Sequence, residues 1–321
     1  MTMRAPTRDD VLRAAVKVAR ILPPTPLLPV DIDGVTVWAK AESLQPVGAF
    51  KIRGAWHRLT DLSEAERARG VIGVSSGNHA QGVAWAARKL GIAATIVMPS
   101  DAPAVKLDRT RELGAEVVLY DRANEDRDAV AAALVEERGA TLVHAYADPW
   151  VIEGQGSSGI ELAAQMAERA GGGPTRIVCP CGGGGLTAGL ALACPEAEIV
   201  PVEPEGWDDV RRSLEAGAIV AVGPNPPPTA CDALQTLATR PVNFAVLKAR
   251  VPKGLAVSEA EVRAAQRFAF ARLRLVIEPG GATALAAALA GKVALDGRTA
   301  IVLSGGNVDP TAFARVLASD N

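Results

Sequence analysis

Short apolar segments alternate with helix-length amphipathic segments from residue 71 onward. The predicted strands cover 71–76, 94–99, 115–120 and 141–146. Between them, the apolar spacing predicts helices over 79–90, 103–113 and 124–138, each followed by a glycine. Strand–helix–strand units in one sheet cross over right-handedly, so this alternation predicts a parallel sheet covered by helices. The expected fold class is therefore α/β.

A second group of elements flanks this block. Helices are predicted over 9–21, 155–170, 186–193, 258–272 and 281–290, and strands over 35–40, 175–180, 198–203 and 299–306. The interruption near 147–155 divides the chain into two α/β units. We expect a large domain formed by residues 1–69 and 149–321, with a smaller domain, residues 70–148, inserted between its two parts.

Charge and composition exclude several classes of protein. The 321-residue chain has a formal net charge of −2, which gives no basic surface for nucleic acid or for a membrane. No apolar run is long enough for a transmembrane helix, and the N-terminus lacks the apolar core of a secretory signal. We therefore expect a cytoplasmic protein. The four cysteines (179, 181, 194 and 231) lack the spacing of a metal site, so buried, reduced thiols are expected.

Lys51 stands in an apolar setting at the start of a predicted helix, directly after Phe50. Burial disfavours the ammonium form and lowers the pKa of a lysine. A neutral amine can form a Schiff base with a carbonyl compound. The alternative is an amphipathic helix whose lysine reaches solvent.

The segment VSSGNHAQG (74–82) ends a predicted strand and opens a helix. Hydroxyl groups, an amide and backbone N–H groups at a helix N-terminus favour binding of a carboxylate. Ser75, Ser76, Gly77 and Asn78 supply these groups. An ordinary strand-to-helix turn is the alternative, in which His79 is a core residue.

Four consecutive glycines, 182–185, separate a predicted strand from a helix. Without Cβ atoms, such a turn can wrap a phosphate and direct its N–H groups at it. The pattern Gly183-x-Gly185-x-x-Ala188 also fits a dinucleotide-binding turn, with Glu203 placed to bind a ribose. A nicotinamide-dependent oxidoreductase is therefore the alternative, although it leaves 42–55 and 74–82 without a function.

Ser304 ends the last predicted strand, within LSGGNVD (303–309). A serine there can form a hydrogen bond with a heteroatom of a ring-shaped ligand. A plain Gly-Gly turn is the alternative.

Together, these segments resemble the serine/threonine dehydratase and serine racemase family of pyridoxal phosphate (PLP) enzymes, which have fold type II, the tryptophan synthase β fold. The matching motifs are LQPVGAFKIRGA (44–55), SSGNHAQG (75–82), DPWVIEGQG (148–156), CGGGGL (181–186), VIEPGGA (276–282) and SGGNVD (304–309). The resemblance implies a parallel-sheet large domain, an inserted smaller domain, a PLP site in the cleft between them, and a homodimer.

The resemblance also assigns roles to residues. Those implied at the cofactor are Phe50, Lys51, Asn78, Gly182, Gly183, Gly184, Gly185, Leu186 and Ser304. Those implied at the substrate are Ser75, Ser76, Gly77, Asn78, His79 and Thr236. Lys51 would hold PLP and later move the Cα proton, while the glycines surround the phosphate and Ser304 faces the pyridine nitrogen. Unlike an aspartate, a serine does not keep that nitrogen protonated, which favours β-elimination over transamination.

The activity implied is that of an ammonia-lyase, which converts L-threonine, L-serine or a similar 3-hydroxy amino acid to a 2-oxo acid and ammonia. Ser76 raises an alternative, since a serine here in racemase-type members faces Cα opposite Lys51. Serine racemase and threo-3-hydroxyaspartate dehydratase are therefore alternatives. Arg240 could pair with the second carboxylate of a 3-hydroxyaspartate-like substrate, or it could be an ordinary solvent-exposed arginine.

The segment VEPEGWDDV (202–210) resembles the divalent-cation site of the racemase group. Glu203, the Trp207 backbone carbonyl and Asp209 would then supply oxygen ligands for Mg²⁺ or Ca²⁺. Solvated acids on a loop are the alternative.

Overall fold

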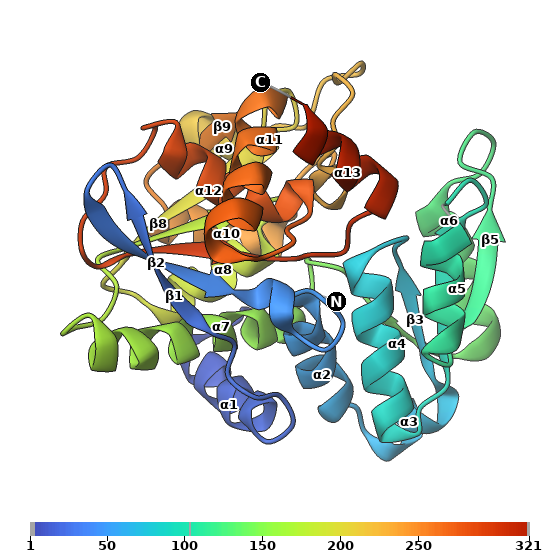
Figure 1. The fold of residues 1–321 in the computed structure, drawn as a ribbon. Coiled ribbons are helices and arrows are strands. Elements are labelled where there is room, and N and C mark those ends of the chain that lie inside the picture. Colours follow the sequence, from blue (N-terminus) through green and yellow to red (C-terminus); the bar gives the residue numbers. More distant parts are fainter. Residues whose placement is uncertain (1–3, 103, 320–321) are drawn as a thin grey trace.

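The computed structural model describes residues 4–102 and 104–319 and contains two β-sheets with helices packed against them (Figure 1). The strands are β1 (Leu27–Ile32), β2 (Val35–Ala41), β3 (Val71–Val74), β4 (Ala94–Pro99), β5 (Glu116–Tyr120), β6 (Thr141–Val143), β7 (Arg176–Pro180), β8 (Glu198–Pro204), β9 (Leu255–Val257) and β10 (Thr299–Leu303). The helices are α1 (Arg8–Ala19), α2 (Lys51–Thr60), α3 (Glu64–Arg69), α4 (Asn78–Leu90), α5 (Ala104–Glu112), α6 (Arg127–Arg138), α7 (Pro149–Arg169), α8 (Gly185–Ala193), α9 (Asp209–Ala216), α10 (Pro241–Arg250), α11 (Glu259–Phe268), α12 (Pro279–Leu289) and α13 (Pro310–Ala318). The predicted α/β class is confirmed.

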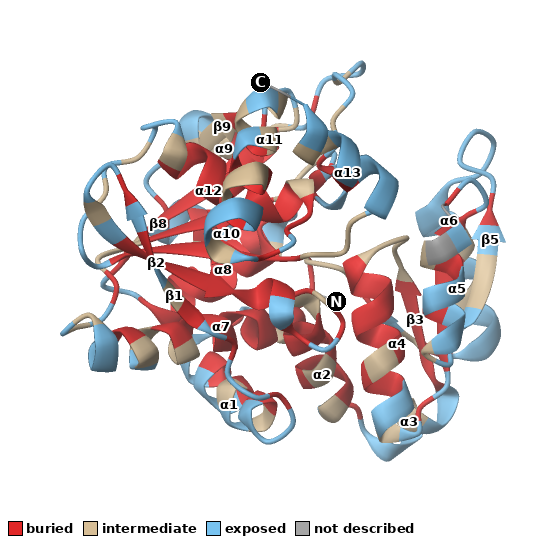
Figure 2. Ribbon diagram, in the orientation of Figure 1, coloured by how far each residue is buried: buried red, intermediate tan, exposed pale blue. Residues whose placement is uncertain are grey.

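The larger sheet has six strands in the order β1-β2-β10-β7-β8-β9. Its β1–β2 pair is antiparallel and its other pairs are parallel. Helices α11 and α12 cover one face, and α1, α7, α8 and α10 cover the other. The central strands are buried on both faces (Figure 2), which explains why they read as continuous apolar runs.

The smaller sheet has four parallel strands in the order β5-β4-β3-β6. All four come from the chain between β2 and β7, so this unit interrupts the larger one in sequence. Helices α2, α4 and α5 pack on one face and α6 on the other. The domain boundaries at residues 70 and 148 stay a prediction.

Helix α7 begins six residues before its predicted start, so the interruption expected near 147–155 lies instead between Val143 and Pro149. Asp148 caps the helix by accepting hydrogen bonds from the backbone N–H groups of Trp150 and Val151, and a proline follows the cap. The glycines of α7 permit close packing. A Cβ atom on Gly154 would lie 2.6 Å from Gly54 Cα on α2. The same glycines make the start of a long helix resemble a break in the sequence pattern.

Six short elements were not predicted, namely β1, α3, α9, α10, β9 and α13. Each has ten residues or fewer, and the periodic signal over such a length is weak. The helix predicted over 258–272 is divided. Helix α11 ends at Phe268, a π-helical turn continues to Leu273, and Arg274 follows in the left-handed region with φ of 59°.

All four cysteines are free and buried, as predicted. No helix within residues 4–102 and 104–319 has both the length and the apolar character needed to cross a membrane.

Candidate active site

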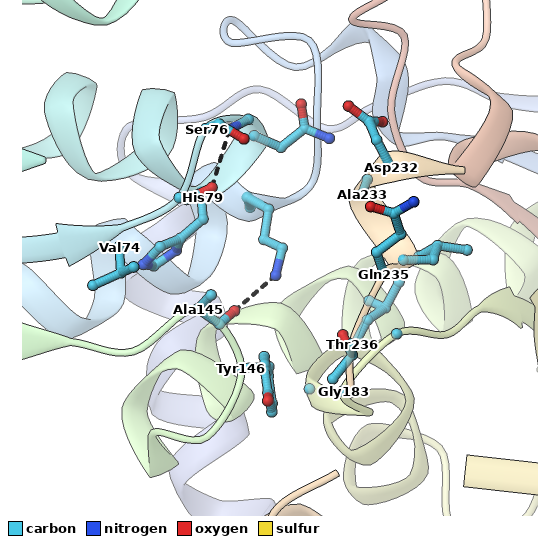
Figure 3. Close-up of a pocket in the computed structure, with 18 of the residues that line it drawn as sticks. Val74, Ser76, His79, Ala145, Tyr146, Gly183, Asp232, Ala233, Gln235 and Thr236 are labelled. Carbon is cyan, nitrogen blue, oxygen red and sulfur yellow. Dashed lines mark hydrogen bonds between the residues drawn. The ribbon is translucent and has the colours of Figure 1, made fainter. Parts of the chain in front are cut away.

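A cavity of about 570 Å³ opens at the carboxyl ends of β3 and β6 in the smaller sheet and of β7 and β10 in the larger sheet. Ligands of α/β proteins bind at such strand ends. The cavity is lined by every residue predicted at the cofactor or the substrate, namely Phe50, Lys51, Ser75, Ser76, Gly77, Asn78, His79, Gly182, Gly183, Gly184, Gly185, Leu186, Thr236 and Ser304. Figure 3 shows Ser76 and His79 on one side and Thr236 on the other.

Lys51 is the first residue of α2, and its side chain enters the cavity. Its Nζ atom donates a hydrogen bond of 2.7 Å to the Ala145 carbonyl oxygen and lies 5.3 Å from the centre of the Phe50 ring. Burial lowers the pKa of Lys51 to about 8, although the nearby Glu278 opposes this shift. With this pKa, about a tenth of the amine is neutral at pH 7 and about half at pH 8, which suits an amine that attacks a carbonyl group.

The glycine turn forms the N-terminus of α8. Gly184 caps this helix in the left-handed region, with φ of 84°. A Cβ atom on Gly183 would lie 2.3 Å from the Tyr146 ring, and one on Gly182 would lie 3.1 Å from Thr236 Oγ1. The turn therefore needs glycine for space as well as for conformation, and it presents backbone N–H groups and the positive helix end to the cavity.

The turn between β3 and α4 is partly tied to itself. Ser75 Oγ accepts a hydrogen bond of 3.1 Å from the Gly77 backbone N–H. This N–H group was expected to be free for a ligand, but it already has a partner within the turn. His79 Nε2 donates to the Val143 carbonyl at 2.8 Å. Burial, reinforced by the charge of Lys51, lowers the pKa of His79 to about 3. His79 is thus a neutral residue that holds the turn against β6.

Glu278 is a cavity residue that was not among the predicted site residues. It precedes α12, is 4% exposed, and accepts a hydrogen bond of 2.6 Å from Asn78 Nδ2. Burial raises the pKa of Glu278 to about 7. Asn307 Nδ2 donates to Asn78 Oδ1 at 2.7 Å. A lone glutamate within the apolar run VIEPGG (276–281) was the signal that could have revealed it.

His144 and Tyr146 were also missed. His144 Nδ1 accepts hydrogen bonds from the backbone N–H groups of Tyr146 and Ala147, at 3.2 and 2.9 Å. Burial, with the charge of Arg240, lowers the pKa of His144 to about 4, so the ring is neutral and carries its proton on Nε2. Both residues were placed in the strand predicted over 141–146, whereas β6 ends at Val143. As strand residues they were given no role in the site.

The three predicted metal ligands lie outside this cavity. Both Glu203 oxygens accept backbone hydrogen bonds, from Val210 at 3.0 Å and Arg211 at 2.7 Å. Asp209 Oδ2 accepts one from Thr239, while its buried Oδ1 has no partner. Within the described residues, no group of three or more His, Cys, Asp or Glu could hold a metal ion. Because its oxygens are engaged by the backbone outside the cavity, Glu203 is also not placed to bind the ribose of a dinucleotide.

Comparison with known proteins decides the family. The model of the pyridoxal-phosphate dependent enzyme family matches residues 18–305. The chain belongs to this family. It is 39% identical to an L-threo-3-hydroxyaspartate ammonia-lyase of Saccharomyces cerevisiae, over 98% of both chains, and 39% identical to a serine racemase of Schizosaccharomyces pombe, also over 98% of both. A solved structure of a T.th. threonine deaminase matches with a TM-score of 0.87 and 44% identity, over 95% of this chain and 99% of that one.

The cavity of this pyridoxal-phosphate-dependent enzyme fits its cofactor. The buried amine of Lys51 suits the aldehyde, and the turn at Gly182–Gly185, where an added Cβ would meet Tyr146, suits the phosphate. Ser304, which directly follows β10, lines the same cavity. The predicted fold type II is confirmed by these relatives, and the dinucleotide interpretation of the glycine turn is set aside.

Proposed function

We propose that this enzyme is an ammonia-lyase that converts a small 3-hydroxy amino acid, such as L-threonine or L-serine, to a 2-oxo acid and ammonia. The observation that carries the proposal is one cavity in which Lys51, the glycine turn and the 75–79 turn face one another. Lys51 can hold the aldehyde of PLP, and the glycine turn can hold its phosphate. The 75–79 turn can hold the carboxylate of an amino acid. Relatives named as ammonia-lyases support the reaction class.

The side chains around the reaction centre have separate tasks. When bound, PLP supplies the electron sink that lets the Cα proton and then the β-hydroxyl leave. The Lys51 amine, neutral in part at pH 7 to 8, takes the Cα proton at Nζ. The 75–79 turn holds the substrate carboxylate, which replaces the Ser75 hydroxyl at the Gly77 N–H group. Asn78, fixed by Glu278 and Asn307, contributes its amide to the ring side of the site.

Serine racemisation is the second candidate, because Ser76 lines the same cavity as Lys51. Two groups on opposite faces of Cα can remove and return a proton with inversion. The chain is as similar to a serine racemase as to an L-threo-3-hydroxyaspartate ammonia-lyase, at 39% identity in both cases. Sequence identity to these two relatives therefore supports both candidates equally.

The divalent-metal site stays a prediction for Glu203, Trp207 and Asp209. The partnerless Oδ1 atom of Asp209 supports it, since buried carboxylate oxygens are rarely left without a partner. The two backbone hydrogen bonds to Glu203 oppose it. Tb³⁺ luminescence titration of the purified protein and of Asp209→Asn tests the site directly.

The reaction is tested with purified wild-type and Lys51→Ala, each supplied with PLP. We expect wild-type to show a visible absorption band and to form 2-oxo acid from a 3-hydroxy amino acid, and Lys51→Ala to lose both. Lys253→Ala, an exposed lysine outside the cavity, is the control. A wild-type protein that stays colourless with added PLP would overturn the proposal. Homodimer formation and cytoplasmic location also stay predictions, and sedimentation velocity measures the first.

A further inference from the structure

The charged side chains that line the cavity include more basic than acidic residues. The basic residues that line it are Lys51, Lys106, Arg109, Arg127 and Arg240, and the acidic ones are Asp128, Asp232, Glu278 and Asp309. Lys106 pairs with Asp232, and the charge of Glu278 acts on Lys51. Asp309 is used as the N-cap of α13. One further cluster in the cavity contains two arginines and one aspartate.

Arg127 and Arg240 share this one acid. Arg127 Nε lies 3.7 Å from Asp128 Oδ1, and Arg240 Nη2 lies 3.8 Å from Asp128 Oδ2. Both distances exceed that of a hydrogen bond, and the three side chains are 52 to 62% exposed. Such pairs are weak in water. Two guanidinium groups, one from each unit of the fold, therefore meet at the cavity with one positive charge uncompensated.

Helix capping does not explain an arginine at position 240, although its side chain lies near enough to Tyr146 to oppose the rise that burial causes in the pKa of that residue. Arg240 is the N-cap residue of α10, and its side chain makes no capping hydrogen bond. Ser, Thr, Asp and Asn are preferred at this position, and a cation near a helix N-terminus is unfavourable. The arginine charge adds to the positive end of the helix, so an anion bound here would relieve both.

Both guanidinium groups act on the wall of the cavity beside the reaction centre. Each lowers the pKa of His144, after burial, and each opposes the burial that raises the pKa of Tyr146. Between these two residues lies Ala145, whose carbonyl oxygen accepts the hydrogen bond of Lys51. The positive charge is thus close to the part of the cavity wall that Lys51 contacts, beside which a bound amino acid would place its side chain.

Two anions could occupy this position, the phosphate of PLP or a second carboxylate on the substrate. The glycine turn at the N-terminus of α8 already offers backbone donors to the phosphate. We propose that Arg240, with Arg127, binds a second carboxylate on the substrate, so that the enzyme prefers a 3-hydroxy amino dicarboxylic acid to serine or threonine. The inference rests on the proposed ammonia-lyase function. The Cα–H and Cβ–OH bonds break, water leaves, and hydrolysis of the resulting imine gives ammonia and a 2-oxo dicarboxylic acid.

The kinetic test compares holoenzymes of wild-type, Arg240→Gln and Arg250→Gln. Arg250 ends the same helix, is exposed and does not line the cavity. We expect the ratio of kcat/KM for L-threo-3-hydroxyaspartate to that for L-threonine to fall about tenfold or more in Arg240→Gln and to stay at the wild-type value in Arg250→Gln. An unchanged ratio in Arg240→Gln would overturn the inference.

A binding test separates this inference from the reaction itself. L-aspartate and L-alanine differ by one carboxylate and lack the leaving hydroxyl, and their dissociation constants are read from the visible spectrum of the holoenzyme. Arg240→Gln should weaken L-aspartate binding about tenfold and L-alanine binding less than about twofold. Weaker PLP binding with an unchanged L-aspartate to L-alanine ratio would assign Arg240 to the phosphate instead. If no hydroxy amino acid yields a 2-oxo acid, the proposed function fails, yet this comparison still tests the arginine.

Discussion

The side-chain amide of Asn78 donates a hydrogen bond of 2.6 Å to the carboxylate of Glu278, 200 residues further along the chain. Asn78 begins α4 beside the smaller sheet, and Glu278 precedes α12 beside the larger sheet. Asn307 binds the opposite end of the same amide, so the orientation of Asn78 is fixed from both sides. This bond joins the two units of the fold at the wall of the cavity.

Glu278→Gln should change the pH dependence of stability. The folded-state pKa of about 7 lies above the ordinary 4.5, so the folded protein binds this proton more tightly than the unfolded chain. Proton binding to Glu278 adds at most about 3 kcal/mol to the free energy of unfolding. This contribution is complete below pH 4.5 and is lost as pH rises through 7. Urea unfolding of the cofactor-free protein at pH 5 and pH 8 measures it. Glutamine cannot ionise, so the variant should lose less stability than wild-type across this range, and an identical loss would contradict the assignment.

Gly183→Ala should weaken PLP binding about tenfold or more. The new Cβ atom would lie 2.3 Å from the Tyr146 ring, so either the ring or the glycine turn must move. Spectroscopic titration of the cofactor-free protein with PLP gives the dissociation constant. Gly173→Ala is the matched control, because nothing lies within 4 Å of its added Cβ. Equal PLP affinities in the two variants would show that the turn does not surround the phosphate.

Ser76→Ala separates elimination from racemisation. If Ser76 exchanges a proton on the face of Cα opposite Lys51, its removal should lower conversion of L-serine to D-serine by about 100-fold or more. Formation of 2-oxo acid from L-serine, which uses Lys51 for proton removal, should fall much less. Chiral chromatography and an oxo-acid assay on the same sample give both rates. Parallel losses in the two rates would mean that Ser76 acts in substrate binding alone.

Arg53→Met should destabilise the fold by about 3–5 kcal/mol. Arg53 is 1% exposed, and its guanidinium binds both oxygens of the buried Glu42, at 2.7 and 2.8 Å, and Glu161 at 2.9 Å. Removing the guanidinium leaves the buried carboxylate of Glu42 without its paired cation, because the nearby Lys40 pairs with Glu161. Denaturant unfolding with PLP absent provides the comparison. Arg138→Met, at the surface pair with Glu116, should cost less than about 1 kcal/mol.

Helices and strands could be predicted where the pattern of apolar residues is long or where a glycine or proline ends it sharply. Strand β4 has the predicted bounds, and α4 ends where Gly91 was expected to stop it. Prediction failed where tertiary packing overrides local preference. The glycines of α7 oppose a helix locally, yet they let it approach α2 and α8, and the packing energy of those contacts exceeds the propensity cost.

The sequence by itself determined the α/β class, the inserted unit and the motifs from which the PLP site was inferred, because each depends on periodicity or on a short local pattern. The tertiary structure alone decided which distant groups share the cavity. The raised pKa of Glu278, the fixed amide of Asn78 and the meeting of Arg127 with Arg240 arise from burial and from contacts between segments far apart in the chain. Desolvation and long-range charge interactions have no counterpart in a local pattern of residues, so only the folded chain reveals them.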